Sequence, residues 1–229
     1  MIGRKFGIVI PCFNEAGNLP TLISQCEDLA STGLFEFVLV NNGSSDNSIG
    51  IMRGKTIPNV RIVDLRENRG YGGGILAGLE NLNTEYVGWT HADLQTDLIS
   101  SLTSLQKEDF DFFKGVRLGR SPMERLFSSG MGIVCSVLFR TKLNEINAQP
   151  TVLNRRLFDS WKNPPTDFSL DLYAILIAKK KKSRIVRSNF VFSKRNSGRS
   201  SWNHGFKSRV KMVIRTLKYA VSLFRKGVN

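Results

Sequence analysis

Short apolar runs alternate with segments of helical spacing over the first 90 residues, and this alternation restricts the fold more than any other feature. Buried parallel strands read as continuous apolar runs rich in β-branched residues, whereas helices repeat their apolar positions every three or four residues. The order of the two patterns predicts an α/β fold, an open and mostly parallel sheet flanked by helices. The expected strands are 6–11, 35–40, 59–65 and 86–90, and the expected helices are 18–34 and 73–82.

A polar or glycine-rich segment follows each of these four runs: CFNEAGN, NNGSSDN, ENRGYGGG and HADLQTD. In open α/β sheets, ligands bind beyond the carboxyl ends of the strands. We therefore expect the four segments to meet at one site. The glycines of the third segment match a dinucleotide fingerprint only superficially, because they do not follow the first strand. Their expected role is to let the backbone approach a ligand or another element closely.

The pattern is less regular after residue 115, but it still contains recognisable elements. Helices are expected over 125–139 and 168–178, and a strand over 183–192. The polar segment 195–205 is of the kind that closes over ligands. Because no linker or repeat interrupts the chain, we expect a single domain over 1–229.

Charge is distributed unevenly along the chain. The net charge is +14, yet residues 172–229 contain 16 Lys and Arg and no Asp or Glu, so the preceding part is nearly neutral. Such a basic segment favours a partner that carries phosphate groups. The partner could be nucleic acid, an anionic lipid or a phosphorylated substrate. No recognised nucleic-acid-binding module accompanies it, so nucleic acid is not expected.

Residues 206–226 predict an amphipathic helix with an apolar stripe and a basic face. Two interpretations remain open: the helix lies in the interface of an anionic membrane, or it packs on its own domain. No run of about 18 uncharged apolar residues predicts a membrane-spanning helix. The first apolar run is too short for a signal peptide, and three cysteines without metal spacing fit a reducing compartment.

The acidic segment after the fourth run offers oxygen ligands for a hard cation. Asp93 and Gln95 suit Mg²⁺ or Mn²⁺ bound together with substrate phosphates. His91 lies on the same side of an extended chain, because alternate residues share a face. It is therefore either a third metal ligand or a residue that orders the site without touching the metal.

The four segments IVIPCFNEAGNL, VLVNNGSSDNS, ENRGYGGGILAGL and WTHADLQTD together resemble the family-2 glycosyltransferases. The resemblance is to the branch of dolichyl-phosphate mannose synthase and covers residues 5–115 most strongly. It implies a GT-A fold and an inverting transfer of a sugar from a nucleotide diphosphate sugar, with Mg²⁺ or Mn²⁺. The implied acceptor is a polyprenyl phosphate or a lipid-linked saccharide, met by a peripheral protein at the cytoplasmic membrane face.

The resemblance also implies which segment of the chain binds which substrate. Residues 1–115 would bind the nucleotide sugar and residues 116–205 the acceptor, and 206–226 would follow them as the basic amphipathic helix. Site residues carried over by position are Pro11, Asn14, Glu15 and Asn42 for the nucleotide; Asp93, Gln95 and His91 for the cation and diphosphate; Arg117, Arg125 and Ser129 for the lipid phosphate; and Arg195, Arg199, Ser200 and Ser201 for a loop over the diphosphate.

Two departures from the family pattern carry their own expectations. Asn41 and Asn42 replace an Asp-Asp pair, and because an amide both donates and accepts, a cytidine nucleotide becomes an expected alternative. His91 replaces the first acid of an Asp-x-Asp, which predicts weaker or differently tuned metal binding.

The acceptor decides whether the reaction needs a base. A hydroxyl acceptor needs a carboxylate to take its proton, and Asp167 is the candidate, with Asp171 second. A phosphate acceptor is already an anion, in which case Asp167 would only cap a helix. One alternative function is thus a transferase that acts on a hydroxyl in capsule or lipopolysaccharide synthesis. A second alternative is a catalytically weakened relative that serves as a binding partner, in which Asn41, Asn42 and His91 mark the loss of metal binding.

Overall fold

The computed structural model of the chain describes residues 5–120, 122–193 and 206–226. The strands are β1 (Phe6–Cys12), β2 (Phe35–Asn42), β3 (Val60–Leu65), β4 (Tyr86–Trp89), β5 (Phe112–Leu118), β6 (Thr151–Asn154) and β7 (Ile185–Val191). The helices are α1 (Leu19–Ser31), α2 (Ser48–Arg53), α3 (Gly70–Leu79), α4 (Leu98–Thr103), the 3₁₀ turn η1 (Ser104–Gln106), α5 (Pro122–Leu138), α6 (Arg155–Asp159), α7 (Leu170–Lys180) and α8 (Phe206–Lys226).

The seven strands form one sheet in the order β3-β2-β1-β4-β6-β5-β7. All neighbouring pairs are parallel except the two that involve β6, which is antiparallel to both β4 and β5. The open, mostly parallel sheet expected from the sequence is therefore confirmed. Strands β5 and β6 were not predicted. β6 has only four residues, and β5 places a lysine in a fully buried position, so neither shows a clear apolar pattern.

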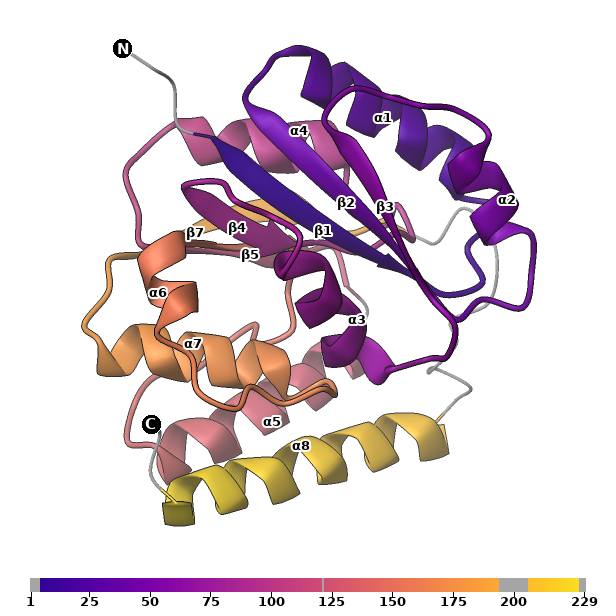
Figure 1. The fold of residues 1–229 in the computed structure, drawn as a ribbon. Coiled ribbons are helices and arrows are strands. Elements are labelled where there is room, and N and C mark those ends of the chain that lie inside the picture. The colour runs from indigo at the N-terminus through magenta and orange to yellow at the C-terminus, as the bar shows by residue number, and fades with distance from the viewer. Residues whose placement is uncertain (1–4, 121, 194–205, 227–229) are drawn as a thin grey trace.

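Helices cover both faces of the sheet, as Figure 1 shows: α1, α2 and α4 on one face, and α3, α5, α7 and α8 on the other. Successive strand residues point to opposite faces. In β1, Ile8 and Ile10 therefore pack with α1, while Val9 packs with α3. α3 begins at Gly70, three residues earlier than the sequence predicted, because the glycines themselves form its first turn.

Helix α8 lies beside α5 on the outside of this second face (Figure 1). Thr216 and Ala220 are fully buried, and the ring of Phe224 meets that of Phe139 at a centroid distance of 6.1 Å. Ile214, Val221 and Phe224 nevertheless leave between 40% and 54% of their surface exposed. The helix thus packs on the domain and still presents apolar side chains outward.

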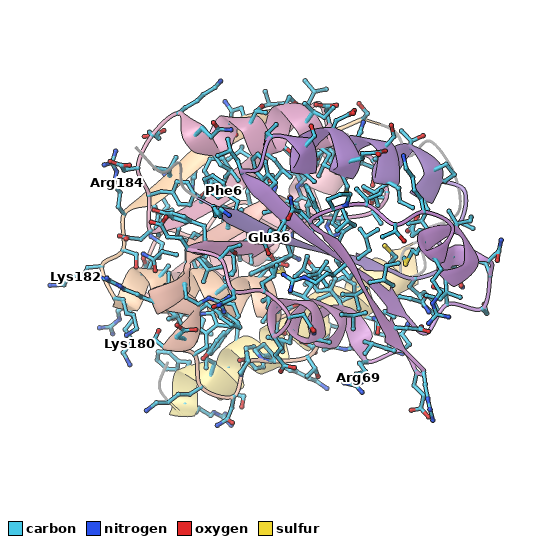
Figure 2. All side chains as sticks on the ribbon, turned by 45° about the horizontal axis from the view of Figure 1, so that its top comes forward. Phe6, Glu36, Arg69, Lys180, Lys182 and Arg184 are labelled. Carbon is cyan, nitrogen blue, oxygen red and sulfur yellow. The ribbon has the colours of Figure 1, made fainter. Side chains whose placement is uncertain are left out.

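Within the described residues, no helix has the length and apolar character that crossing a membrane requires. Charged side chains extend outward at the end of α7 and the start of β7, where Figure 2 shows Lys180, Lys182 and Arg184 pointing away from the body of the protein. Phe6, by contrast, lies inside the fold in the same view.

Candidate active site

The loops after β1 and β2 are joined into one shelf by hydrogen bonds. Asn14, at φ +57°, accepts from the backbone N–H of Ser45 at 2.8 Å through its Oδ1. Its own N–H donates to the Ser44 hydroxyl at 3.1 Å, and the N–H of Ala16 donates to Asp46 at 3.1 Å. Burial raises the pKa of Asp46, but hydrogen bonds from the Ser48 hydroxyl and from backbone N–H groups outweigh it and lower the pKa below its usual value. Asp46 therefore stays an anion that fixes the shelf.

Glu15 belongs to the same shelf. Its backbone N–H donates to the Ser48 hydroxyl at 3.0 Å, and its carboxylate accepts from the Asn18 side chain at 2.6 Å. Pro11 lies further back, at the end of β1. The structure thus brings the predicted nucleotide residues of the first loop to the carboxyl edge of the sheet.

Asn41 and Asn42 both use their amides to hold neighbouring backbone and side chains. Asn42 is 4% exposed; its Nδ2 donates to the carbonyl of Gly70 at 3.0 Å, and its Oδ1 accepts from the N–H of Arg69 at 3.0 Å. Asn41 donates to the carboxylate of Asp64 at 2.7 Å. An aspartate cannot donate either bond. The two asparagines therefore have a structural role that does not involve a nucleotide base.

The glycine-rich segment brings α3 against the backbone that precedes α7. Gly73 donates its N–H to the carbonyl of Thr166 at 2.9 Å, and a Cβ built at Gly72 would lie 2.6 Å from the carbonyl oxygen of Pro165. No side chain fits in that space. Close approach to another element, one of the two roles expected of these glycines, is what the structure shows.

A turn over residues 93–95 follows β4 and is pinned to the end of β7. The Asp93 carboxylate accepts from the N–H of Gln95 at 3.2 Å, and Leu94 between them has a φ of +54°. Gln95 donates its side-chain amide to the carbonyl of Ser193 at 3.0 Å, and Ser193 N–H donates to the Gln95 carbonyl at 2.8 Å. Asp97 caps α4 by accepting from Ser100 N–H at 2.6 Å. The turn is therefore fixed against Ser193, two residues after the end of β7.

His91 packs against an aromatic side chain of α3. Its ring lies 5.8 Å from that of Tyr71, which in turn stacks on Phe168 at 4.7 Å. Among residues 5–120, 122–193 and 206–226, no group of three or more His, Cys, Asp or Glu side chains is arranged to hold a metal ion. The oxygen donors of Asp93 and Gln95 remain suited to a hard cation that takes its other ligands from substrate phosphates.

The two candidate bases have different surroundings. Asp167 is 29% exposed; one carboxylate oxygen accepts from Ser169 N–H at 2.9 Å and the other lies 3.9 Å from Nε of Arg215 on α8. Asp171 is buried and pairs with Lys114 at 2.8 Å. A buried, paired carboxylate has no path to an acceptor hydroxyl. The second candidate for a base, Asp171, therefore does not fit that role.

The predicted acceptor residue Arg117 forms part of a cationic cluster. Its Nε donates to Glu145 at 3.0 Å, and its guanidinium lies 5.7 Å from the ring centre of Phe192. Arg120 pairs with the same Glu145 and donates to Ser128 on α5 at 2.8 Å. Sequence reasoning missed Arg120 and Glu145, since only folding brings residue 145 to β5.

The remaining predicted site residues are less fully placed. Ser129 is exposed on α5, one position after Ser128. Arg125 lies on the same helix, but its side chain falls outside the description. Arg195, Arg199, Ser200 and Ser201 also lie outside the described residues. For these six positions the roles stay predictions.

Known proteins resemble this chain in both sequence and fold. The family model for glycosyl transferase family 2 matches residues 7–171. The undecaprenyl-phosphate 4-deoxy-4-formamido-L-arabinose transferase of Sodalis glossinidius is 34% identical over 125 residues, which are 51% of this chain and 38% of that protein. The enzyme of the same name from Yersinia pestis is 34% identical over 126 residues, with the same shares. The match thus spans less than half the length of these relatives.

Solved structures with the same fold have low sequence identity. Glucosyl-3-phosphoglycerate synthase from Mycobacterium tuberculosis, in complex with Mn²⁺, UDP and phosphoglyceric acid, has a TM-score of 0.75 at 16% identity and covers 97% of this chain and 79% of its own. A mannosyltransferase from Pyrobaculum calidifontis, in complex with GDP-Man and Mn²⁺, has a TM-score of 0.69 at 18% identity, covering 97% and 65%. The fold is the GT-A fold. With a family model matched over most of its length, this chain belongs to glycosyl transferase family 2.

Proposed function

We propose that this chain is an inverting glycosyltransferase that moves a sugar from a nucleotide diphosphate sugar to a polyprenyl phosphate or lipid-linked acceptor. The observation that carries the proposal is the meeting of two features at one edge of the sheet. The shelf around Asn14 and Asp46 follows β1 and β2, and the Asp93–Gln95 turn follows β4. The relative that matches over 125 residues is named as a transferase acting on undecaprenyl phosphate, which supports a lipid-phosphate acceptor.

The donor is proposed to lie across the carboxyl ends of β1, β2 and β4. Pro11, Asn14, Glu15 and Asn42 form the nucleotide side, and Asp93 with Gln95 the diphosphate side. Mg²⁺ or Mn²⁺ would be held by Asp93, assisted by Gln95, and would neutralise charge on the departing diphosphate. Neighbours with the same fold were solved with Mn²⁺ and nucleotides, which supports a divalent cation.

The acceptor is proposed to lie on the other half, near Arg117. Attack from the side opposite the leaving diphosphate inverts the anomeric carbon. A phosphate acceptor needs no base. With such an acceptor, the role of Asp167 is structural: it accepts a hydrogen bond from Ser169 and lies close to Arg215. In the alternative reading, with a hydroxyl acceptor, the partly exposed Asp167 is the base.

Peripheral attachment to an anionic membrane, at its cytoplasmic face, is part of the proposal, and the outer faces of α5 and α8 support the attachment. Ile133, Val134 and Val137 on α5 are 49% to 74% exposed, and Ile214, Val221 and Phe224 on α8 are 40% to 54% exposed. Exposed Lys211, Lys218 and Arg225 on α8 belong to the segment that contains no acid. Apolar side chains flanked by cations suit a lipid interface, since the former enter the acyl boundary and the latter attract anionic headgroups.

Sugar transfer to undecaprenyl phosphate, measured with labelled UDP-, GDP- and CDP-sugars and Mn²⁺, tests the proposal. Asp93→Asn should abolish transfer. Asp97→Asn is the matched control, since it removes a carboxylate four residues away yet keeps an N-cap residue of equal quality. Equal turnover of the two variants contradicts the metal assignment. Nucleotide binding without transfer to either acceptor class would point to the catalytically weakened relative.

His91 can be tested in the same assay. His91→Asp should strengthen the dependence on Mn²⁺ if the imidazole ligates the cation, because a carboxylate is the harder ligand. An unchanged dependence assigns His91 to ordering the site, which its contact with Tyr71 also supports.

A further inference from the structure

A buried polar network connects the two halves of the chain beneath His91. Asp171 on α7 accepts from Lys114 of β5 at 2.8 Å and from the Tyr71 hydroxyl of α3 at 3.0 Å. Gln149 donates to the same hydroxyl at 2.8 Å, and Lys114 also donates to Thr151 of β6 at 2.6 Å. Lys114 and Asp171 are 0% and 1% exposed at their side chains. The network therefore joins α3 to β5, β6 and α7, and its two charged groups are shielded from water.

Stability alone does not explain such a network. Taking two charges out of water costs about as much as their attraction returns, and replacing a buried pair by apolar residues is often neutral or stabilising. Burial lowers the pKa of Lys114, although the neighbouring Asp171 counteracts it, so the lysine does bear this cost. The part of the network closest to the candidate site is Tyr71, whose ring contacts those of both Phe168 and His91.

We propose that Tyr71, held by Asp171 and Lys114, is a positioning residue that fixes the ring of His91 and through it the Asp93–Gln95 turn. Two bonds on the hydroxyl and one stacked ring leave Tyr71 a single orientation. His91 rests against that ring, two residues before Asp93. The proposal deepens the proposed function, on which it rests for the role of the turn. Partners of this kind commonly change metal affinity by about tenfold or more when removed.

Tyr173 provides a matched control on α7. It too is buried, and its hydroxyl also makes two hydrogen bonds, accepting from the N–H and donating to the carbonyl of Lys162 at 2.8 and 2.9 Å. Tyr71→Phe and Tyr173→Phe each remove one buried hydroxyl with two partners. A change at His91 that appears in Tyr71→Phe and not in Tyr173→Phe therefore reports positioning rather than the loss of a hydroxyl in general.

The measurement is the imidazole resonance of His91 in two-dimensional NMR spectra at a fixed pH above neutrality. The chain has two histidines, His91 and His204, so His204→Gln assigns the signal. We expect Tyr71→Phe to shift and broaden the His91 resonance and to weaken Mn²⁺–UDP binding about tenfold, while Tyr173→Phe changes neither. An unchanged His91 resonance in Tyr71→Phe overturns the proposal.

A paired substitution guards against unfolding as the explanation. Lys114→Met combined with Asp171→Leu removes both buried charges and the acceptor of the Tyr71 hydroxyl, and it avoids the larger cost of leaving one buried charge unpaired. It should reproduce the His91 shift of Tyr71→Phe, and a wild-type resonance in this folded variant would also overturn the proposal. If neither the wild type nor any variant binds nucleotide, the proposed function fails. The His91 resonance still decides whether Tyr71 positions the His91 ring.

Discussion

The side-chain amide of Asn41 donates to the carboxylate of Asp64 at 2.7 Å, and the two residues are direct partners in the register of β2 and β3. The same Asn41 accepts from Ser44 N–H at 3.2 Å. This pair explains why an amide occupies the first position of a segment where the family pattern has acid. Two carboxylates at that distance would repel each other.

Exchanging the two side chains tests this explanation. Asn41→Asp alone should destabilise the fold by about 1–3 kcal/mol, because it places like charges together and removes the donor. Asn41→Asp with Asp64→Asn should recover most of that loss, since one amide and one carboxylate are again opposed. Urea unfolding of the single and double variants measures both. If the double variant is no more stable than Asn41→Asp, the pair has no such role.

The nucleotide preference is a separate prediction. Because both amides already use a donor inside the protein, the substitution by asparagine does not itself require cytidine. We expect Asn42→Asp to weaken all nucleotides together, by loosening the loop at Gly70, rather than to change their order. Calorimetric titration with UDP, GDP and CDP checks this. A selective loss of one nucleotide would show that Asn42 reads the base.

Gln95 should affect the donor more than the fold. Gln95→Ala removes the bond to Ser193 that pins the turn over residues 93–95 to the end of β7, at a net cost of about 1 kcal/mol. We expect a raised KM for the donor with a fall in Tm of only about 2–4 °C. Gln106→Ala, at an exposed position in η1, serves as the control and should alter neither value. A donor KM that is unchanged in Gln95→Ala contradicts the prediction.

Attachment to lipid should depend on one face of the protein. Val137→Asp and Phe224→Asp place a charge on the outer faces of α5 and α8, and both should reduce sedimentation with anionic vesicles. Ile99→Asp is the matched control, because Ile99 is also an exposed apolar residue but lies on α4, which covers the opposite face of the sheet. Equal losses in all three variants would contradict docking through α5 and α8.

The cysteines should be unreactive in the native state. Burial raises the pKa of the Cys135 thiol to about 11 and raises those of Cys12 and Cys26 further. Because the thiolate is the nucleophile, alkylation by iodoacetamide at neutral pH should be slow until the protein unfolds. Labelling of Cys135 should accelerate only as the pH rises toward that pKa. Mass spectrometry at several pH values, with denatured protein as the reference, measures it; rapid native labelling would contradict the burial.

Local sequence patterns were enough to predict most strands and helices in the first half of the chain. Residues 6–11 and 35–40 read as buried strands, and the structure confirms them in β1 and β2, because such strands are apolar throughout. β5 was missed because Lys114 interrupts its apolar pattern, although that lysine is fully buried. Its burial depends on Asp171, 57 residues away, and no local pattern contains that information.

The sequence by itself determined the α/β class, the four polar segments at one edge of the sheet and the candidate role of Asp93. Each depends on short-range periodicity or on residue types within a few positions. Only the tertiary structure decided that Asp171 is a buried partner of Lys114 and Tyr71 rather than a base, and that Asn42 holds the loop at Gly70. Those assignments depend on burial and on contacts between distant segments, which set whether a polar side chain faces water, a substrate or another residue.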